Sequence, residues 1–390
     1  MNKHNWTYKK LGEVASFSRG LTYSKSDVAT ESSKKVLRSN NIDLATHSLN
    51  FDDVVCLKEE FKIPVDKMLQ PNDIFICMSN GSTQHLGKVA FIEKKIDYAF
   101  GGFMGAIHPN INAVFPKFAY YYCLSSEYRR SLATVLNGIN INNIKWSDLS
   151  RFPIPVPDLT EQERIVAELD LLSSIIEKKK AQLQEYDQLA QSIFYDMFGD
   201  PITNEKGWDV IQLGEVCDYS DTRIKSECVT TENYVGVENL LQECKGKVPA
   251  NKVPDGLNLT GYIEGDVLLG NIRPYLKKIW LANQNGGCNG DVLVIRRKLH
   301  YLTQVIPIYI FGCLSKDAFF DYAMHYSKGE KMPRGDKKEI LKYRIVLPPI
   351  SLQKEFAEKI EAIEKQKALV QASIVETETL FNSRMDYYFN

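Results

Sequence analysis

Side chains that can bind phosphates or base edges gather in four short stretches of the sequence. Amides and hydroxyls stand in glycine-containing stretches, and arginines and lysines stand beside proline, tyrosine or glycine. Arginine suits guanine, asparagine or glutamine suits adenine, and basic side chains bind phosphates. Solvated surface loops are the alternative interpretation. The first candidate group comprises Ser79, Asn80, Ser82, Thr83, Gln84, Lys88, Asn140, Asn142, Asn143 and Lys145. The second comprises Asn271, Arg273, Tyr275, Lys277, Lys278, Lys331, Arg334, Lys337 and Lys338.

Sequence signs of catalysis are weak. The chain has no N-P-P-[YF] or D-P-P-[YF] motif, no G-x-G-x-x-G and no Walker loop. The glycines of residues 101–105 have the wrong spacing for a nucleotide site, and the E-x-K tripeptide at residues 243–245 is of a kind that arises by chance. Six histidines are scattered, and eight cysteines form no C-x-x-C pair. We expect no catalytic residue, no metal site and a reduced, cytoplasmic protein.

The chain contains one passage twice. "FPIPVPDLTEQERIVAELDLL" begins at Phe152 and "YRIVLPPISLQKEFAEKIEAI" at Tyr343, an offset of 191 residues that also places Gln162 on Gln353. The same offset holds for more than forty residues. Upstream, "LGEV" occurs twice, and the offset drifts between 188 and 202, as expected where loops differ in length. The chain is therefore a tandem duplication of one unit.

Each copy combines short strands with helices. Apolar runs rich in β-formers are bounded by glycine, asparagine and proline, which is typical of strands and turns. Residues 116–136 have a helical pattern. This mixture predicts an α+β domain built twice. The expected strands lie in residues 72–78, 87–93, 103–109, 265–270, 277–283 and 291–297.

A long amphipathic helix follows each proline-rich entrance. Thr160 or Ser351 is the expected N-cap, with Glu163 completing a capping box in the first copy. Apolar residues then alternate at spacings of four and three, a heptad seam interrupted by Lys179 and Lys367. Each helix of about 35 residues is about 50 Å long. We expect the two helices to form an antiparallel coiled coil between two heads, a dumbbell; ordinary core packing is the alternative.

Charge and exposed apolar residues suggest partners. Residues 161–200 carry 4 basic and 9 acidic side chains and residues 351–390 carry 5 and 7, so the total of −1 leaves mildly basic heads. Leu171, Ile175 and Leu189 lie off the seam and predict a partner-binding surface. The longest apolar run, residues 301–314, contains a proline and is too short to cross a bilayer, so no membrane association is expected.

The whole layout resembles the specificity subunit of type I restriction-modification enzymes. The resemblance rests on the two "W…LGEV" entrances, "SNGSTQHLGKVAFI", "NGININNIKWSDLSRFPIP", and the paired entrances "IPVPDLTEQERIV" and "IVLPPISLQKEF". It implies target recognition domain 1 in residues 1–155, a central spacer helix in 156–200, target recognition domain 2 in 201–347 and a C-terminal spacer helix in 348–390. The second head departs from the pattern at "RPYLKKIW", so the two heads should read different sequences.

The resemblance also implies a function. Each head would read one half of a bipartite, asymmetric site in double-stranded DNA, and the helices would dock two methyltransferase (modification) subunits. Restriction (motor) subunits complete such complexes. S-adenosylmethionine, ATP and magnesium would belong to those partners, which leaves this chain a non-catalytic subunit of an adenine methyltransferase/restriction endonuclease complex with no cofactor of its own. The alternatives are a free-standing sequence-specific DNA-binding protein, a subunit of a modification-only or type II-like system, and an enzyme with an unrecognised site.

Overall fold

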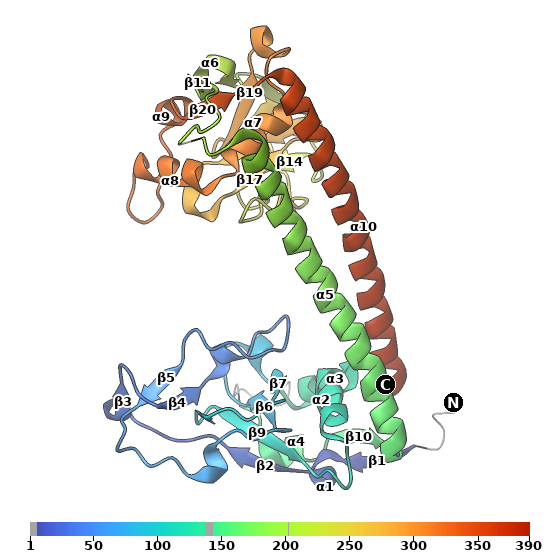
Figure 1. The fold of residues 1–390 in the computed structure, drawn as a ribbon. Helices are drawn as coiled ribbons and strands as arrows, with labels where there is room; N and C mark the ends of the chain where they lie inside the picture. Colours follow the sequence, from blue (N-terminus) through green and yellow to red (C-terminus); the bar gives the residue numbers. More distant parts are fainter. Residues whose placement is uncertain (1–5, 137–142, 202) are drawn as a thin grey trace. The chain divides into compact units, whose positions relative to one another are not determined.

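The chain divides into two compact units. The computed structural model describes residues 6–136, 143–201 and 203–390 (Figure 1). Unit 1 is Met1–Lys180 with Ala372–Asn390, and unit 2 is Ala181–Gln371. Each unit holds one globular head and a part of each long helix. Head 1 is defined as the segment from β1 to β10, and head 2 as the segment from β11 to β20. The expected α+β heads with long helices are confirmed.

Head 1 contains two four-stranded sheets and a two-stranded ribbon. One sheet has the order β2-β9-β6-β7: Ala15–Arg19, Met104–Pro109, Ile74–Cys77 and Val89–Phe91. The other has the order β3-β5-β4-β8: Val28–Ala29, Val55–Leu57, Lys34–Leu37 and Tyr98–Phe100. The ribbon pairs β1 (Thr7–Lys10) with β10 (Pro153–Val156). The helices are α1 (Leu11–Val14), α2 (Pro116–Leu124), α3 (Ser126–Leu136) and α4 (Trp146–Leu149).

Head 2 repeats this element order. Its central sheet is β12-β19-β16-β17: Cys217–Tyr219, Val292–Arg297, Val267–Gly270 and Ile279–Leu281. The second sheet is β13-β15-β18-β14: Arg223–Lys225, Asn258–Tyr262, Gly286–Cys288 and Tyr234–Val235. The ribbon pairs β11 (Asp209–Gln212) with β20 (Arg344–Leu347). The helices are α6 (Leu213–Val216), α7 (Pro307–Leu314), α8 (Asp317–His325) and α9 (Lys337–Leu341).

The second sheets of the two heads differ in strand order. In head 1 the parallel pair is β4 with β8, and β4 lies inside the sheet next to β5. In head 2 the parallel pair is β14 with β18, but β18 pairs with β15 and leaves β14 at the edge. Both heads therefore contain the parallel strand pair, but the strand next to that pair differs between them.

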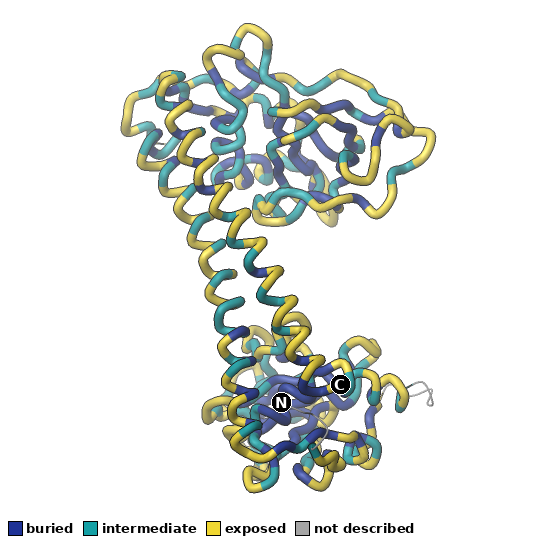
Figure 2. Tube along the Cα trace, turned by 90° about the vertical axis from the view of Figure 1, so that its right-hand side faces the viewer, coloured by how far each residue is buried: buried dark blue, intermediate teal, exposed yellow. Residues whose placement is uncertain are grey.

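Each head packs on the beginning of one long helix and the end of the other. In unit 1, Phe118 and Tyr122 of α2 join Leu169 and Phe389 in one core. In unit 2, Tyr309 of α7 packs with Phe194, Phe198 and Phe356. Figure 2 shows buried residues concentrated in the heads, with exposed and intermediate residues along the helices. Because Phe198 and Phe389 are related by the repeat offset, the same aromatic residue closes both cores.

The long helices are α5 (Leu159–Phe198) and α10 (Ile350–Phe389), with 40 residues each. The predicted seam is confirmed, because its residues are all buried or half-buried. Both seam lysines cross to the other helix. In unit 1 the Lys179 Nζ donates to Ser373 Oγ at 2.6 Å, and in unit 2 the Lys367 Nζ lies 2.8 Å from a carboxylate oxygen of Asp187. Within each unit the two helix segments run antiparallel.

The repeated entrance has two polar anchors. The predicted N-caps at Thr160 and Ser351 are wrong, because the helices begin at Leu159 and Ile350. In the first copy Asp158 lies one residue before the helix, and its carboxylate accepts the Glu161 N–H at 3.0 Å. Gln162 and Gln353 are buried; their side-chain oxygens accept the N–H groups of Phe115 and Ile306. Each glutamine also donates to the proline carbonyl before its helix. The repeated glutamine therefore ties the helix entrance to the start of α2 or α7.

Candidate nucleic-acid interface

The predicted stretches of each head lie side by side at the end of its central strand. In head 1 the chain leaves β6, Ser79 bridges to Asn143, and the Ile144 N–H donates to the Met78 carbonyl at 2.8 Å. In head 2 the chain leaves β16, Ile272 bridges to Arg334, and the Arg273 N–H donates to Pro333 at 2.7 Å. Two segments that are far apart in sequence thus form one surface in each head. Asn140 and Asn142 lie outside the described residues.

Two of the predicted DNA-binding lysines are directed into the protein. Lys88 is 3% exposed, and its ammonium donates to the Ile42 carbonyl at 2.8 Å. Its equivalent in head 2, Lys278, donates to the Val237 carbonyl at 2.7 Å. Burial lowers the pKa of Lys88. In this structure both lysines hold a neighbouring turn; Lys88 is buried, and Lys278 is half-buried.

That turn was missed by sequence reasoning. We call residues 38–42 and 236–240 the anchored turns. In head 1 the side-chain oxygen of buried Asn41 accepts the Arg38 N–H at 2.7 Å, and in head 2 that of Asn239 accepts the Gly236 N–H at 2.9 Å. Asn80 joins the turn to the loop after β6 through a 2.8 Å bond to Ser39. The offset of 198 between the asparagines falls within the repeat drift and could have revealed the turn.

Head 1 has a hollow between the anchored turn, the loop after β6 and the hairpin before β9. Its volume is ≈ 700 Å³. The Arg38 guanidinium lies 2.9 Å from Asp53, and Asn40 donates to the same carboxylate at 2.9 Å. Phe103, in the glycine-rich hairpin, is 73% exposed beside them. The wall of the hollow is formed by Leu21, Thr22, Tyr23, Arg38, Ser39, Asn40, Ser79, Asn80, Gly81, Gly101, Gly102, Phe103 and Met104.

The remaining predicted residues of head 1 are accessible. Ser82, Thr83 and Gln84 are exposed in the loop after β6, and Asn143 and Lys145 are exposed in the approach to α4. The side-chain oxygen of Asn80 accepts the Ser82 N–H at 3.0 Å, which shapes the loop. Head 1 therefore presents mainly hydroxyl and amide groups, which can donate and accept hydrogen bonds at base edges.

Head 2 presents more charge, but part of it is paired. Lys277 lies 3.0 Å from Asp317 and 3.2 Å from Glu243, and hydrogen bonding to Asp317 raises its pKa. Arg334 pairs with Asp291 at 3.2 Å. Asn271 is buried beneath Gly335. The predicted residues with exposed positions are Arg273, Tyr275, Lys331, Arg334, Lys337 and Lys338.

Arg273 and Lys277 bracket a single 3₁₀ turn, Pro274–Leu276, and both have left-handed backbone angles, with φ of 53° and 50°. Such angles are uncommon outside glycine and asparagine. They direct the backbone sharply outward between two buried strands, so Tyr275 stands exposed at the tip. This tight basic turn replaces the serine- and glutamine-containing loop of head 1.

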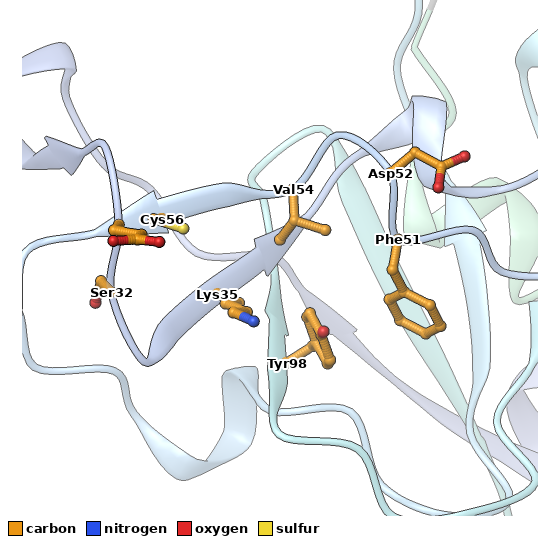
Figure 3. A pocket seen from close by; sticks show the side chains of 8 residues that line it. Ser32, Lys35, Phe51, Asp52, Val54, Cys56 and Tyr98 are labelled. Atoms are coloured by element: carbon orange, nitrogen blue, oxygen red, sulfur yellow. The ribbon is translucent and has the colours of Figure 1, made fainter.

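A second hollow of head 1 lies on the sheet β3-β5-β4-β8 and has a volume of ≈ 630 Å³ (Figure 3). The Lys35 ammonium lies 5.8 Å from the centre of the Tyr98 ring, and Phe51 packs against the same ring at 5.0 Å. Figure 3 shows the Asp52 carboxylate directed away from these three side chains. None of the predicted site residues lines this hollow.

One constellation has the geometry of a hydrolytic triad. Ser18 Oγ lies 2.7 Å from His108 Nε2, and His108 Nδ1 lies 2.6 Å from Asp73. At the equivalent place in head 2, the Arg296 guanidinium binds Asp266 at 2.6 Å and Thr222 at 3.1 Å. Arginine cannot act as a general base, because it stays protonated. The shared feature is a buried carboxylate that holds a neighbouring strand, which is a structural role.

The three predicted partner-binding residues differ in exposure. Leu171 is 62% exposed and Leu189 is 46% exposed, whereas Ile175 is half-buried. On α10, Leu369, Val375 and Leu380 are also exposed, and sequence reasoning did not single them out. Among the described residues, no cluster of three or more histidine, cysteine or acidic side chains suits a metal ion. None of the helices described here has the length and hydrophobicity to cross a membrane.

The two heads share one fold but have different polar side chains at the corresponding surface. They define a class of protein: a single chain with two similar domains whose binding surfaces differ. Residues 3–185 match the family described as "Type I restriction modification DNA specificity domain". The chain is 25% identical over 392 residues to the type I restriction enzyme EcoKI specificity subunit of Escherichia coli (strain K12), covering 92% of this chain and 82% of that protein. Residues 3–185 therefore match a type I DNA specificity domain, and the chain as a whole is similar to type I specificity subunits.

Other proteins are also similar to this chain. The type I restriction enzyme StySPI specificity subunit of Salmonella potsdam is 32% identical over 190 residues, 47% of this chain and 40% of that protein. Two solved structures have the same fold. The type I restriction-modification S subunit from M. genitalium has a TM-score of 0.56 at 15% identity, covering 99% and 96% of the two chains. A chain from a study of assembly and conformational transition in a type I R-M system has a TM-score of 0.57 at 18% identity, covering 98% and 97%.

Proposed function

We propose that this chain is the DNA-reading subunit of a type I restriction-modification complex and that each head reads one half of a bipartite, asymmetric site. One observation carries the proposal. In each head the loop after the central strand lies beside the segment that precedes α4 or α9, and the two segments form one surface. The side chains on this surface differ between the heads. Equal scaffolds with unequal exposed groups are what two different half-sites require.

The proposal extends to partners. Two methyltransferase (modification) subunits dock on exposed apolar residues of the long helices, such as Leu171 and Leu189, and restriction (motor) subunits join them. S-adenosylmethionine, ATP and magnesium belong to those subunits, and the modified base is adenine. This chain then binds DNA and positions its partners without making or breaking bonds itself. It would act in the cytoplasm, where the cell's DNA lies.

Exchange of one head tests the proposal. Residues 205–341 would be replaced by the corresponding head of a relative, and methylated adenines would be mapped genome-wide in cells that also express the modification subunits. We expect one half-site to change and the other to stay, because each head carries its own reading surface. A change in both half-sites would contradict independent heads, and methyl transfer by the purified single chain would contradict a non-catalytic role.

A further inference from the structure

The anchored turns have the same backbone contacts in both heads and different outward side chains. In head 1 the amide of Asn41 also donates to the Asn50 and Asp53 carbonyls, both at 3.1 Å, so this buried side chain fixes the turn from within. In head 2 the Asn239 carbonyl accepts the Val248 N–H at 2.9 Å, as the Asn41 carbonyl accepts the Asn50 N–H at 3.0 Å. The buried lysine of each head holds the turn from the other side.

The outward residues of the two turns carry opposite chemistry. The residues that precede the anchoring asparagine are Arg38, Ser39 and Asn40 in head 1 and Gly236, Val237 and Glu238 in head 2. Head 1 thus offers a guanidinium and an amide, whereas head 2 offers an exposed carboxylate. A carboxylate repels phosphates and accepts only from donors, and the donors on base edges of the major groove are amino groups. These differences are suited to base selection, not to uniform backbone binding.

The Arg38 side chain is held in position before any ligand arrives. Asp53 binds its Nη2 at 2.9 Å and also accepts from Asn40, which orients both side chains along the wall of the 700 Å³ hollow. The Arg38 Nε is buried and has no hydrogen-bond partner in the described part of the chain, so the donors that can face a ligand are those of the two terminal nitrogens. An oriented guanidinium that still has donors to use loses little entropy when it meets an acceptor pair such as guanine O6 and N7.

We propose that the anchored turns are specificity-determining elements of the two heads. Arg38 and Asn40 contact base edges of the first half-site, Arg38 at a guanine and Asn40 at an adenine, with Phe103 as an apolar contact. Glu238 accepts a hydrogen bond from a cytosine amino group in the second half-site. The inference rests on the proposed function, because it assigns the residues that perform the reading.

Binding selection from a pool of duplexes with randomised half-sites tests this assignment. The full-length chain with its modification subunits would be compared with Arg38→Lys, Asn40→Ala and Glu238→Gln proteins by sequencing the bound duplexes. We expect Arg38→Lys and Asn40→Ala each to lower discrimination at one position of one half-site by about 5- to 150-fold. Glu238→Gln should do the same in the other half-site only.

Two controls separate reading from folding and charge. Arg38→Lys keeps the positive charge beside Asp53 but loses the planar fork, so lost discrimination with unchanged affinity for non-specific duplexes indicates base reading. Lys62→Ala removes an exposed charge of head 1 that does not line the hollow, and its base preferences should equal those of the wild type. Unchanged consensus in the Arg38 and Asn40 variants, or equal loss in both half-sites, would overturn the inference. A wild-type complex that selects no bipartite consensus would instead refute the proposed function.

Discussion

Asp73 and Asp266 hold the same position in the two heads, one residue before the central strand, but they bind different partners. Asp73 binds His108, and Asp266 binds Arg296 through both of its oxygens. The anchoring residues of the turns, in contrast, are asparagines in both heads, and the inward lysines are also the same. Groups that fix the backbone thus stay alike between the copies, whereas the side chain that binds the buried carboxylate differs between them.

The comparison also extends to the junction between each head and the end of a long helix. Ser126 of head 1 and Lys316 of head 2 are equivalent positions after α2 and α7, and each contacts the end of a long helix. Ser126 donates to Asp386 at 3.0 Å, whereas the Lys316 ammonium lies 4.2 Å from the centre of the Phe194 ring. The same junction is therefore closed by a hydrogen bond in one unit and by a buried cation in the other.

The strongest test of the two-unit division is truncation of the repeated aromatic residue. Phe198→Ala should destabilise unit 2 and Phe389→Ala unit 1, each by about 3–5 kcal/mol, because a fully buried ring leaves a cavity. Hydrogen exchange resolved by peptide would measure protection in each unit. Leu189→Ala, which truncates an exposed side chain, is the control. Equal loss of protection in both units after either aromatic substitution would contradict the division.

Lys316 should make the stability of unit 2 depend on pH at a junction where head 1 has the uncharged Ser126. Burial lowers its pKa to about 8 from the ordinary 10.5, so between these values the unfolded state binds more protons than the folded state. Stability should therefore rise as pH increases from about 8 to 10.5. The gain is on the order of 3 kcal/mol, since each pKa unit corresponds to about 1.4 kcal/mol.

Denaturant unfolding of unit 2 at several pH values, in wild type and Lys316→Met, would measure this contribution. Cys244, Cys313 and Asp317 lie near the ammonium and are present in both proteins, so their own titration largely cancels in the difference. The wild type should approach the variant in stability as pH rises. A difference that is constant from pH 7 to 10.5 would contradict the assigned pKa.

The buried carboxylates of Asp266 and Asp73, which bind different partners, give a third comparison. Asp266→Asn should destabilise unit 2 by about 2 kcal/mol, because it removes charged hydrogen bonds to a guanidinium. Asp73→Asn should cost unit 1 less, about 1 kcal/mol, because one histidine nitrogen is involved. Thermal unfolding of both variants, with Asp52→Asn at an exposed position as the control, would rank them. A larger loss of stability for Asp73→Asn than for Asp266→Asn would contradict this ranking of the two carboxylate contacts.

Local periodicity explains what the sequence could predict. The six expected strands, the helical pattern of residues 116–136 and the heptad seams are all present, because each depends on neighbouring residues. The exception is the helix start, where Asp158 and Thr160 are both good caps. The proline-rich strand ends early enough for the helix to begin at Leu159, so Asp158 becomes the cap.

Long-range contacts explain what the sequence could not predict. Lysine is normally exposed, so nothing in the residue type indicated that Lys88 and Lys278 donate to carbonyls of a distant turn. Arg38 and Asn40 stand 39 or more residues before Ser79, and only the folded sheet brings them to one hollow. The loops after β6 and β16 could be predicted from residue type and the internal repeat. The anchored turns that complete each surface could be located only in the folded structure.

The last predicted effect concerns a place where the two cores differ. Tyr122 in head 1 stands where head 2 has Gly312, and Gly312 leaves room for the Phe194 ring. The Tyr122 side chain is fully buried, and its hydroxyl has no hydrogen-bond partner among the described residues. Because a buried unsatisfied hydroxyl is costly, Tyr122→Phe should stabilise unit 1 by about 1 kcal/mol.

Tyr128 supplies the matched control for this substitution. It packs against Tyr122 in the same core, but its hydroxyl donates to the Gly87 carbonyl at 3.2 Å. Tyr128→Phe should therefore destabilise unit 1 by about 1 kcal/mol, since a buried carbonyl loses its partner. Chemical denaturation of both variants gives two changes of opposite sign from the same chemical change. If both substitutions destabilise the protein, the Tyr122 hydroxyl has a partner in solution, and the two cores differ less than their ring packing indicates.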